Sequence, residues 1–186
     1  MILFTVGTNE QPFDRLVSAA ADLSTETGYV QYGSSRVPRG RGTWVDFVPF
    51  QELRDLMLAA QVVICHAGVG SIMLAHRAGR RPIVVPRLLR LSEAVDNHQL
   101  PLARRLHERG IVTLVEDTGR LDLAIGSAKT PARWLPEARP LPGADALAAE
   151  LCGHLTALGV SRDERAAPVV ADERAAPVVA QSTTLY

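Results

Sequence analysis

One stretch constrains the fold more than any other, the segment 62–72 with the sequence VVICHAGVGSI. Its first four residues are apolar, as expected for a parallel strand that is covered on both faces. Gly68 and Gly70 follow, and they permit a tight turn and leave room for a ligand beside the backbone. Ser71 then falls where a helix would present free N–H groups and the positive end of its dipole, which bind phosphate. We therefore predict that this loop holds the diphosphate of a nucleotide-activated substrate.

By itself this loop is a weak signal, because many α/β proteins have a glycine turn between strand and helix that binds nothing. The G-x-G-x-x-G fingerprint is not met, no G-x-x-x-x-G-K-[ST] loop is present, and Lys129 is the only lysine. NAD enzymes and P-loop nucleotidases are therefore disfavoured. His66 precedes the turn and would bond either a phosphate oxygen or only neighbouring backbone; its place at a strand end favours phosphate.

Apolar runs alternate with helical patterns along the first 125 residues. This alternation is typical of βαβ units and a parallel sheet, so the predicted class is α/β, Rossmann-like. In such a sheet ligands bind at the carboxyl ends of the strands. The loops that follow strands, which include Gly7-Thr8, Gly33-Ser34, 66–71 and 87–99, would converge there. The predicted strands are 2–6, 29–32, 44–48, 62–65, 82–86 and 111–115.

The domain organisation follows from length and composition. Residues 1–160 are expected to form one domain, with a last helix around Ala144 to Leu158. Residues 161–186 contain a tandem nonapeptide, DERAAPVVA, at 163–171 and 172–180. Two copies are too few for a solenoid, and the composition predicts a disordered tail.

Charge and cysteine content exclude several functions. The chain has 20 basic and 20 acidic residues, so no basic face for nucleic acid is expected. Cys65 and Cys152 suggest neither a disulfide framework nor a metal site, and we expect no metal and no cofactor. Neither a signal peptide nor a membrane-spanning run is expected, which predicts a cytoplasmic chain.

A second polar segment, EAVDNHQ at 93–99, follows the predicted strand 82–86. Asp96 or Asn97 could simply cap the next helix, but that explains one residue out of five that form hydrogen bonds. Carboxylates and amides pair well with vicinal hydroxyl groups. The carboxylates and amides of this segment, Glu93, Asp96, Asn97 and Gln99, therefore predict contacts to the hydroxyl groups of the sugar and the ribose.

Three segments in this order, His66–Ile72, Pro82–Arg87 and Asp96–Gln99, resemble the C-terminal, donor-binding half of glycosyltransferase family 28. The opening Thr5–Leu16 is similar to the start of bacterial members, and the resemblance covers residues 1–125. Within the family it points to the single-domain catalytic subunits of two-part enzymes. These act in the dolichol pathway and in bacterial exopolysaccharide or capsule assembly.

The resemblance implies the C-terminal half of a GT-B fold, with a UDP-sugar bound at its loops. Full-length relatives place a ribose-binding acid in the helix after the glycine loop, but here 73–75 is Met-Leu-Ala, so we expect that contact from Glu93. His66 is the candidate catalytic residue, as a stabiliser of the departing diphosphate. The implied donor-binding residues are Gly7, Thr8, Gly33, His66, Gly68, Val69, Gly70, Ser71, Glu93, Asp96, Asn97 and Gln99.

The implied function is the catalytic, UDP-sugar-binding subunit of an inverting hexosyltransferase. It would transfer N-acetylglucosamine, glucose or glucuronate to a lipid-diphosphate-linked saccharide. The chain is too short for the acceptor-binding half, so a membrane-associated partner subunit would supply that half, and the general base, and hold the chain at the cytoplasmic membrane. One alternative is a non-catalytic nucleotide-sugar-binding module that scaffolds a partner. A UDP-sugar epimerase is disfavoured, because those enzymes carry both halves in one chain.

Overall fold

The computed structural model describes residues 1–23, 28–36 and 40–129, in which strands and helices alternate. The predicted strands and helices of this part are confirmed, with small differences at their ends. The elements are β1 (Ile2–Thr5), α1 (Asp14–Leu23), β2 (Gly28–Gln31), β3 (Thr43–Val45), α2 (Phe50–Ala59), β4 (Val62–His66), α3 (Val69–Arg77), β5 (Ile83–Val85), η1 (Leu89–Leu91), α4 (Gln99–Glu108), β6 (Thr113–Leu114), η2 (Thr118–Arg120) and α5 (Leu121–Lys129).

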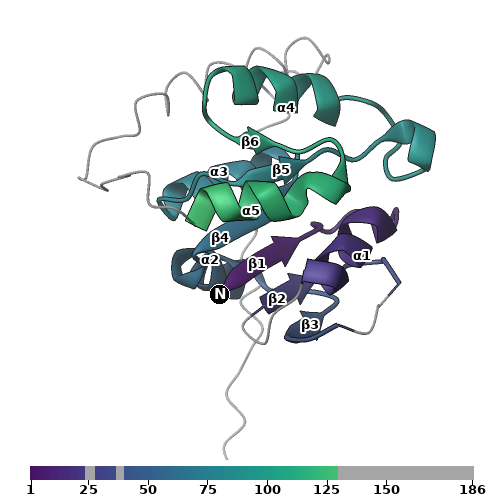
Figure 1. The fold of residues 1–186 in the computed structure, drawn as a ribbon. Coiled ribbons are helices and arrows are strands. Elements are labelled where there is room, and N and C mark those ends of the chain that lie inside the picture. Colours follow the sequence, from purple (N-terminus) through teal and green to yellow (C-terminus); the bar gives the residue numbers. More distant parts are fainter. Residues whose placement is uncertain (24–27, 37–39, 130–186) are drawn as a thin grey trace, which may run out of the picture.

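The described strands form one parallel sheet with the order β3-β2-β1-β4-β5-β6 (Figure 1). Ile2 of β1 lies opposite Gly28 of β2 on one side and Val62 of β4 on the other. The chain winds outward from β1 in one direction and then from β4 in the other, so β1 and β4 flank the switch point of a doubly wound sheet. The predicted α/β, Rossmann-like class is confirmed.

Helices cover both faces of the sheet because alternate strand residues point to opposite sides. Ile2 and Phe4 pack against α1 and α5, whereas Leu3 packs against α2 and α3. Val84 of β5 packs against α4. Figure 1 shows α1 and α5 in front of the sheet and α2 and α3 behind it.

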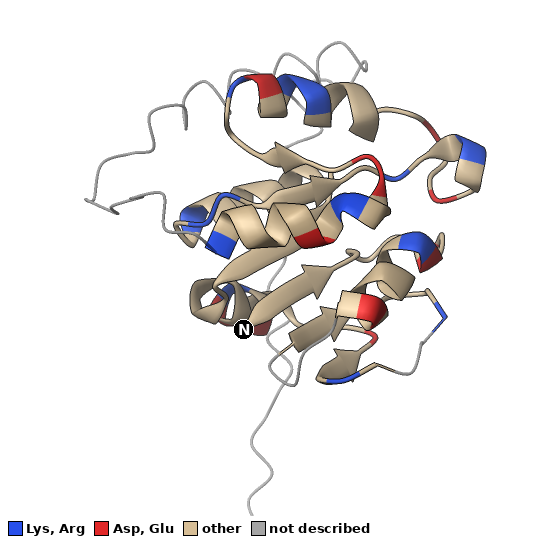
Figure 2. Cartoon of the chain, viewed as in Figure 1, with Lys and Arg blue, Asp and Glu red and all other residues tan. Residues whose placement is uncertain are grey.

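The described strands contain no Asp, Glu, Lys or Arg, and charged residues lie on the helices and loops around them (Figure 2). This is the composition expected of strands buried on both faces. Cys65 belongs to this interior, where burial raises the pKa of its thiol to about 12. None of the helices in the described part of the chain has the length and the apolar character that spanning a membrane requires.

Two differences from the expected boundaries concern loops. The strand expected at 44–48 is Thr43–Val45 in the structure, and just after it the Asp46 side chain accepts a hydrogen bond from the Phe47 N–H at 2.8 Å. The helix after the glycine loop begins at Val69, two residues before Ser71. The helix expected at 144–158 and the tandem repeat lie outside the described residues.

Candidate functional site

A pocket of about 470 Å³ opens at the carboxyl ends of β1 and β4, at the switch point of the sheet. One end is polar and is formed by the loops after β1 and β4. The other end is apolar and is formed by the β3–α2 connection and one face of α2 and α3. The lining residues are Thr5, Gly7, Thr8, Asn9, Gln31, Phe47, Val48, Phe50, Leu53, His66, Gly70, Ser71 and Leu74.

The polar end contains the N-terminus of α3. Gly68 is the residue before the helix, and no side chain caps the first turn. Gly70 and Ser71 belong to that turn and line the pocket. A Cβ built on Gly70 would meet no atom within 4 Å. Uncapped backbone N–H groups and the helix dipole therefore lie beside open space, an arrangement that suits an anion.

His66 lies at the end of β4 with its ring between two glycines. A Cβ on Gly7 would come within 2.5 Å of the His66 Nε2, and a Cβ on Gly68 would collide with the same ring. The Nε2 atom is 3.2 Å from the Ser71 hydroxyl, and the buried Nδ1 has no partner among the described residues. Burial and the nearby charge of Arg87 lower the pKa of His66 to about 4. The imidazole is therefore neutral at pH 7, so its ring nitrogens can donate or accept hydrogen bonds but carry no charge.

Gln31 fixes the loop after β1, although it was not among the site residues predicted from the sequence. Its buried Oε1 accepts hydrogen bonds from the Thr5 hydroxyl at 2.8 Å and from the backbone N–H groups of Val6 and Gly7, both at 3.1 Å. Its Nε2 donates to the Gly7 and Asp46 carbonyls, both at 2.9 Å. Gly7 is held at φ +78°, a conformation that favours glycine. The only signal in the sequence was a glutamine within an apolar strand.

Two of the candidate glycines support the pocket without lining it. Gly33 has φ +58°, and a Cβ there would come within 3.2 Å of the Gly7 carbonyl oxygen and 3.0 Å of Val6. It therefore packs beneath the Gly7 turn. Gly68 leaves space for the His66 ring, as described above. Val69, also a candidate, packs against the apolar cluster around Cys65.

The apolar end carries two phenylalanines that are unusually accessible. Phe47 is 60% exposed and Phe50 is 63% exposed, although both line the pocket. Leu74 of α3 completes this wall and is 8% exposed. No lining residue has a charged side chain. Sequence reasoning assigned none of these apolar residues to the site, because exposed and core phenylalanines look alike in a sequence.

Glu93 lies outside the pocket lining, in a partly buried ion pair with Arg15 of α1. The Arg15 guanidinium donates to both carboxylate oxygens, at 3.0 and 2.9 Å. One of these oxygens also accepts the Leu88 backbone N–H at 3.0 Å. The expected ribose-binding acid thus has protein partners for both oxygens in this structure.

The other candidates in segment 93–99 also lie outside the lining and bind backbone. Asp96 accepts the His98 N–H at 3.0 Å, and Asn97 accepts the Leu89 N–H at 3.3 Å. Gln99 Oε1 accepts the backbone N–H of Ala67 at 3.2 Å and of Arg87 at 3.1 Å, which ties the ends of β4 and β5 together. The alternative that Asp96 or Asn97 merely caps α4 does not hold, because neither residue occupies the N-cap position. His98 precedes this helix and makes no side-chain cap.

The sequence matches the profile of a known family. The profile of the glycosyltransferase family 28 C-terminal domain matches residues 1–132. This chain belongs to glycosyltransferase family 28. The match covers every element of the sheet and both loops of the polar end of the pocket, and it confirms the resemblance found in the sequence.

Two relatives of the family 28 chain share the name UDP-N-acetylglucosamine transferase subunit ALG13. The one from Yarrowia lipolytica is 31% identical over 158 residues, which cover 76% of this chain and 78% of that protein. The one from Homo sapiens is 30% identical over 123 residues, which cover 59% of this chain and only 10% of that protein.

A solved structure has the same fold. The crystal structure of the glycotransferase of kitacinnamycin superposes with a TM-score of 0.51 at 19% identity, and the match covers 90% of this chain and 43% of that one. The family 28 chain thus spans less than half of this structural neighbour. The likeness supports the GT-B C-terminal half-domain expected from the sequence.

Proposed function

We propose that the chain binds the nucleotide of a UDP-sugar and serves as the donor-binding, catalytic subunit of an inverting hexosyltransferase. One observation carries this proposal: a single pocket combines an uncapped helix N-terminus at one end with an aromatic and aliphatic wall at the other. A nucleoside diphosphate has the same two parts. Family membership and the names of the relatives agree with this choice.

The diphosphate would lie at the N-terminus of α3, against Gly70 and Ser71. Its negative charge would meet free N–H groups and the positive end of the helix dipole. The base and ribose would then extend toward Phe47 and Leu74, because a flat, apolar base is suited to an aromatic wall. Thr8 and Asn9 would face the sugar or the phosphate from the loop after β1.

In the proposed reaction an acceptor oxygen attacks the anomeric carbon of the sugar. The new carbon–oxygen bond forms while the bond to the β-phosphate oxygen breaks, and UDP leaves with the bonding electrons. The N–H groups of α3 and a hydrogen bond from neutral His66 stabilise the charge on the departing diphosphate. The acceptor proton passes to a general base, which we assign to the partner subunit. The displacement is redox-neutral, so it needs no redox cofactor.

The finer parts of the proposal concern sugar, acceptor and partner. The sugar is a hexose such as N-acetylglucosamine, glucose or glucuronate, and the acceptor is a saccharide linked to a lipid diphosphate, as in exopolysaccharide assembly. A membrane-associated acceptor-binding subunit would complete the enzyme and keep this chain at the cytoplasmic face of the membrane. The support is that both named relatives are called subunits of a transferase.

The first test is calorimetric titration with UDP, ADP and GDP of the wild type and of Gly70→Phe. Gly70 lies in the first turn of α3, where an added side chain meets open pocket space, so the phenylalanine should fill the diphosphate site without disturbing the fold. We expect selective UDP binding in the wild type and a loss of at least tenfold in the variant.

Gly126→Phe is the matched control. Gly126 is also a helical glycine with nothing within 4 Å of a built Cβ, but it lies in α5, outside the pocket lining. Its UDP affinity should equal that of the wild type. Equal binding by Gly70→Phe and Gly126→Phe would place the nucleotide elsewhere.

Transfer activity separates the catalytic subunit from the scaffolding alternative. The chain alone should release almost no UDP from UDP-sugars, because acceptor and general base are missing. Addition of the acceptor-binding subunit and a lipid-linked saccharide should raise the rate at least 100-fold with one of the three UDP-sugars. A complex that binds UDP but transfers no sugar would favour the non-catalytic module.

A further inference from the structure

Behind the polar end of the pocket lies an arginine cluster, which we define as Arg15, Arg87 and Glu93. Arg87 and Glu93 are buried, whereas Arg15 is partly exposed. Arg87 is 1% exposed, and its guanidinium donates to backbone carbonyl oxygens of two loops, β1–α1 and β5–α4. The acceptors are Val6 at 2.9 Å, Gln11 at 2.7 Å and Glu93 at 2.8 Å, with Pro12 at 3.5 Å. One residue of the β5–α4 loop thus holds the loop that follows β1.

The charges of this cluster do not balance. Glu93 forms its ion pair with Arg15, and none of the described carboxylates is within ion-pair distance of Arg87. Two positive charges and one negative charge leave a formal net charge of +1. Burial lowers the pKa of Arg87 to about 10, so it stays charged at pH 7. Its Nε atom is buried without a partner among the described residues. A buried charge without an ion pair is costly, and the carbonyl bonds together with the attraction of the nearby Glu93 carboxylate offset this cost only in part.

Two observations connect this charge to the pocket. Arg87 bonds the carbonyl of Val6, the residue immediately before Gly7, which lines the polar end. The charge of Arg87 also acts on His66, a lining residue, because its repulsion of the protonated imidazole helps to lower the His66 pKa. The pocket lining itself has no charged side chain. The positive potential at the polar end therefore comes from the helix dipole of α3 and from Arg87 behind the loop.

We propose that Arg87 is a positioning residue that favours the diphosphate through its buried positive charge, while its carbonyl bonds fix the Gly7 loop. This inference rests on the proposed function, since it assigns the anion to the polar end of the same pocket. Arg87 acts across the loop and does not touch the ligand. A charge held in the protein interior acts over several ångströms more strongly than one in water.

The test compares the dissociation constants of UMP and UDP, whose ratio measures the preference for the diphosphate. Arg87→Met should lower this ratio about tenfold, the size expected for one nearby charge in a protein interior. Glu93→Gln raises the net charge of the cluster, so it should increase the ratio about threefold to tenfold. Arg87→Lys keeps the charge and should restore most of the ratio. If the cluster only held the loops in place, Arg87→Met and Glu93→Gln would instead both lower the affinity for UDP.

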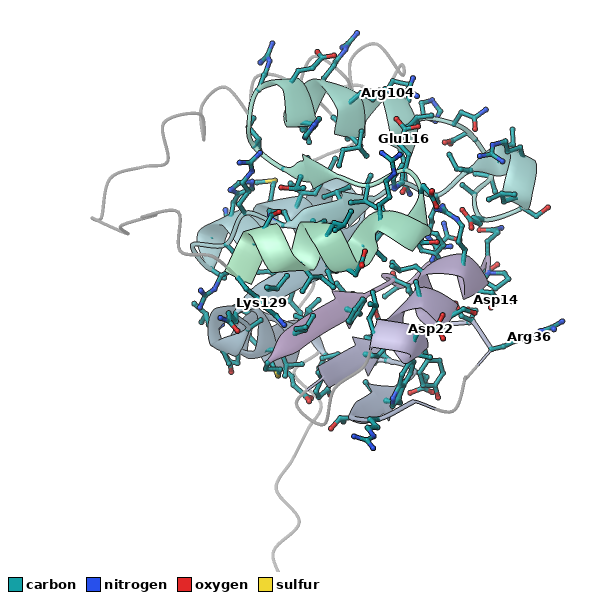
Figure 3. All side chains as sticks on the ribbon, viewed as in Figure 1. Asp14, Asp22, Arg36, Arg104, Glu116 and Lys129 are labelled. Atoms are coloured by element: carbon teal, nitrogen blue, oxygen red, sulfur yellow. The ribbon has the colours of Figure 1, made fainter. Side chains whose placement is uncertain are left out.

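The surface pair Arg104–Glu116 provides matched controls. It has the same two-bond geometry, at 2.8 and 3.0 Å, but joins α4 to the segment after β6 at the surface (Figure 3). Arg104→Met and Glu116→Gln should leave the ratio within twofold of the wild type. If Arg104→Met and Arg87→Met lower the ratio equally, the proposal is overturned, because removing any positive charge would then have the same effect on diphosphate preference.

NMR titration of His66 tests the same charge without nucleotide. The groups that face this ring are Gly7, Gly68, the Ser71 hydroxyl and the Arg87 charge. In Arg87→Met the His66 pKa should rise, although burial should keep it below the ordinary value. If the His66 pKa is the same in Arg87→Met as in the wild type, the charge of Arg87 does not act at the polar end of the pocket, and the proposal fails. Because this readout needs no ligand, failure of wild-type UDP binding would count against the proposed function alone. If Arg87→Met does not fold, Glu93→Gln and Arg87→Lys decide the outcome.

Discussion

The buried imidazole of His66 makes the stability of the molecule depend on pH. Its folded-state pKa is about 4, because burial and the charge of Arg87 disfavour the protonated form. The unfolded chain takes up a proton near pH 6.5. Between these two values the unfolded state binds more protons than the folded state, so stability rises with pH and falls on acidification. Burial also lowers the pKa of His76, which acts in the same direction.

We therefore expect His66→Gln to flatten the dependence of stability on pH. Between pH 7 and pH 5 the wild type should lose about 2 kcal/mol more unfolding free energy than the variant, the amount that linkage assigns to a shift of this size. Urea denaturation at both pH values measures the difference. The variant should retain some pH dependence because His76 remains. Parallel losses in both proteins would contradict a neutral, buried His66.

The turn between β4 and α3 contains two glycines with opposite structural constraints. Gly68 has an ordinary φ of −80°, so it is required for space and not for conformation. A Cβ there would collide with the His66 ring. Gly70 lies inside the helix, and a Cβ built there would have no atom within 4 Å. A glycine at this position therefore only increases the conformational freedom of the unfolded chain. The turn is therefore tight on the side of the strand and open on the side of the pocket.

Alanine at these two positions should change stability in opposite directions. Gly70→Ala should raise the unfolding free energy by about 0.5–1 kcal/mol, the difference in helix propensity. Gly68→Ala should lower it by about 1–3 kcal/mol through overpacking against His66. Denaturant unfolding of the two variants measures both effects. Changes of the same sign would show that the turn differs from the one described.

At the scale of the whole molecule, the fold followed from the sequence more completely than the site did. Alternating apolar runs are local signals, and they predicted the sheet and the meeting of the loops after β1 and β4 at the pocket. The polar end of the pocket was also predicted, because Gly7, Thr8, His66, Gly70 and Ser71 follow strands directly. The mechanism, the donor contacts and the disorder of the tail stay predictions.

The rest of the site depends on contacts that a local pattern does not specify. Glu93 finds Arg15, which is 78 residues away in the chain, and Gln99 binds backbone at the ends of two strands. A polar segment in a sequence indicates that its side chains form hydrogen bonds, but it does not identify the groups that they bind. Gln31 and Arg87 were missed for the same reason. Each is buried, and its role is visible only once distant loops have come together.

The protein's own hydrogen bonds hold the loops around the pocket, five from the Gln31 side chain and the carbonyl bonds of Arg87. Binding then orders little backbone, so the entropic penalty of association is small. No slow rearrangement should precede or follow the encounter of protein and nucleotide. We expect association in a single kinetic phase whose rate increases linearly with nucleotide concentration.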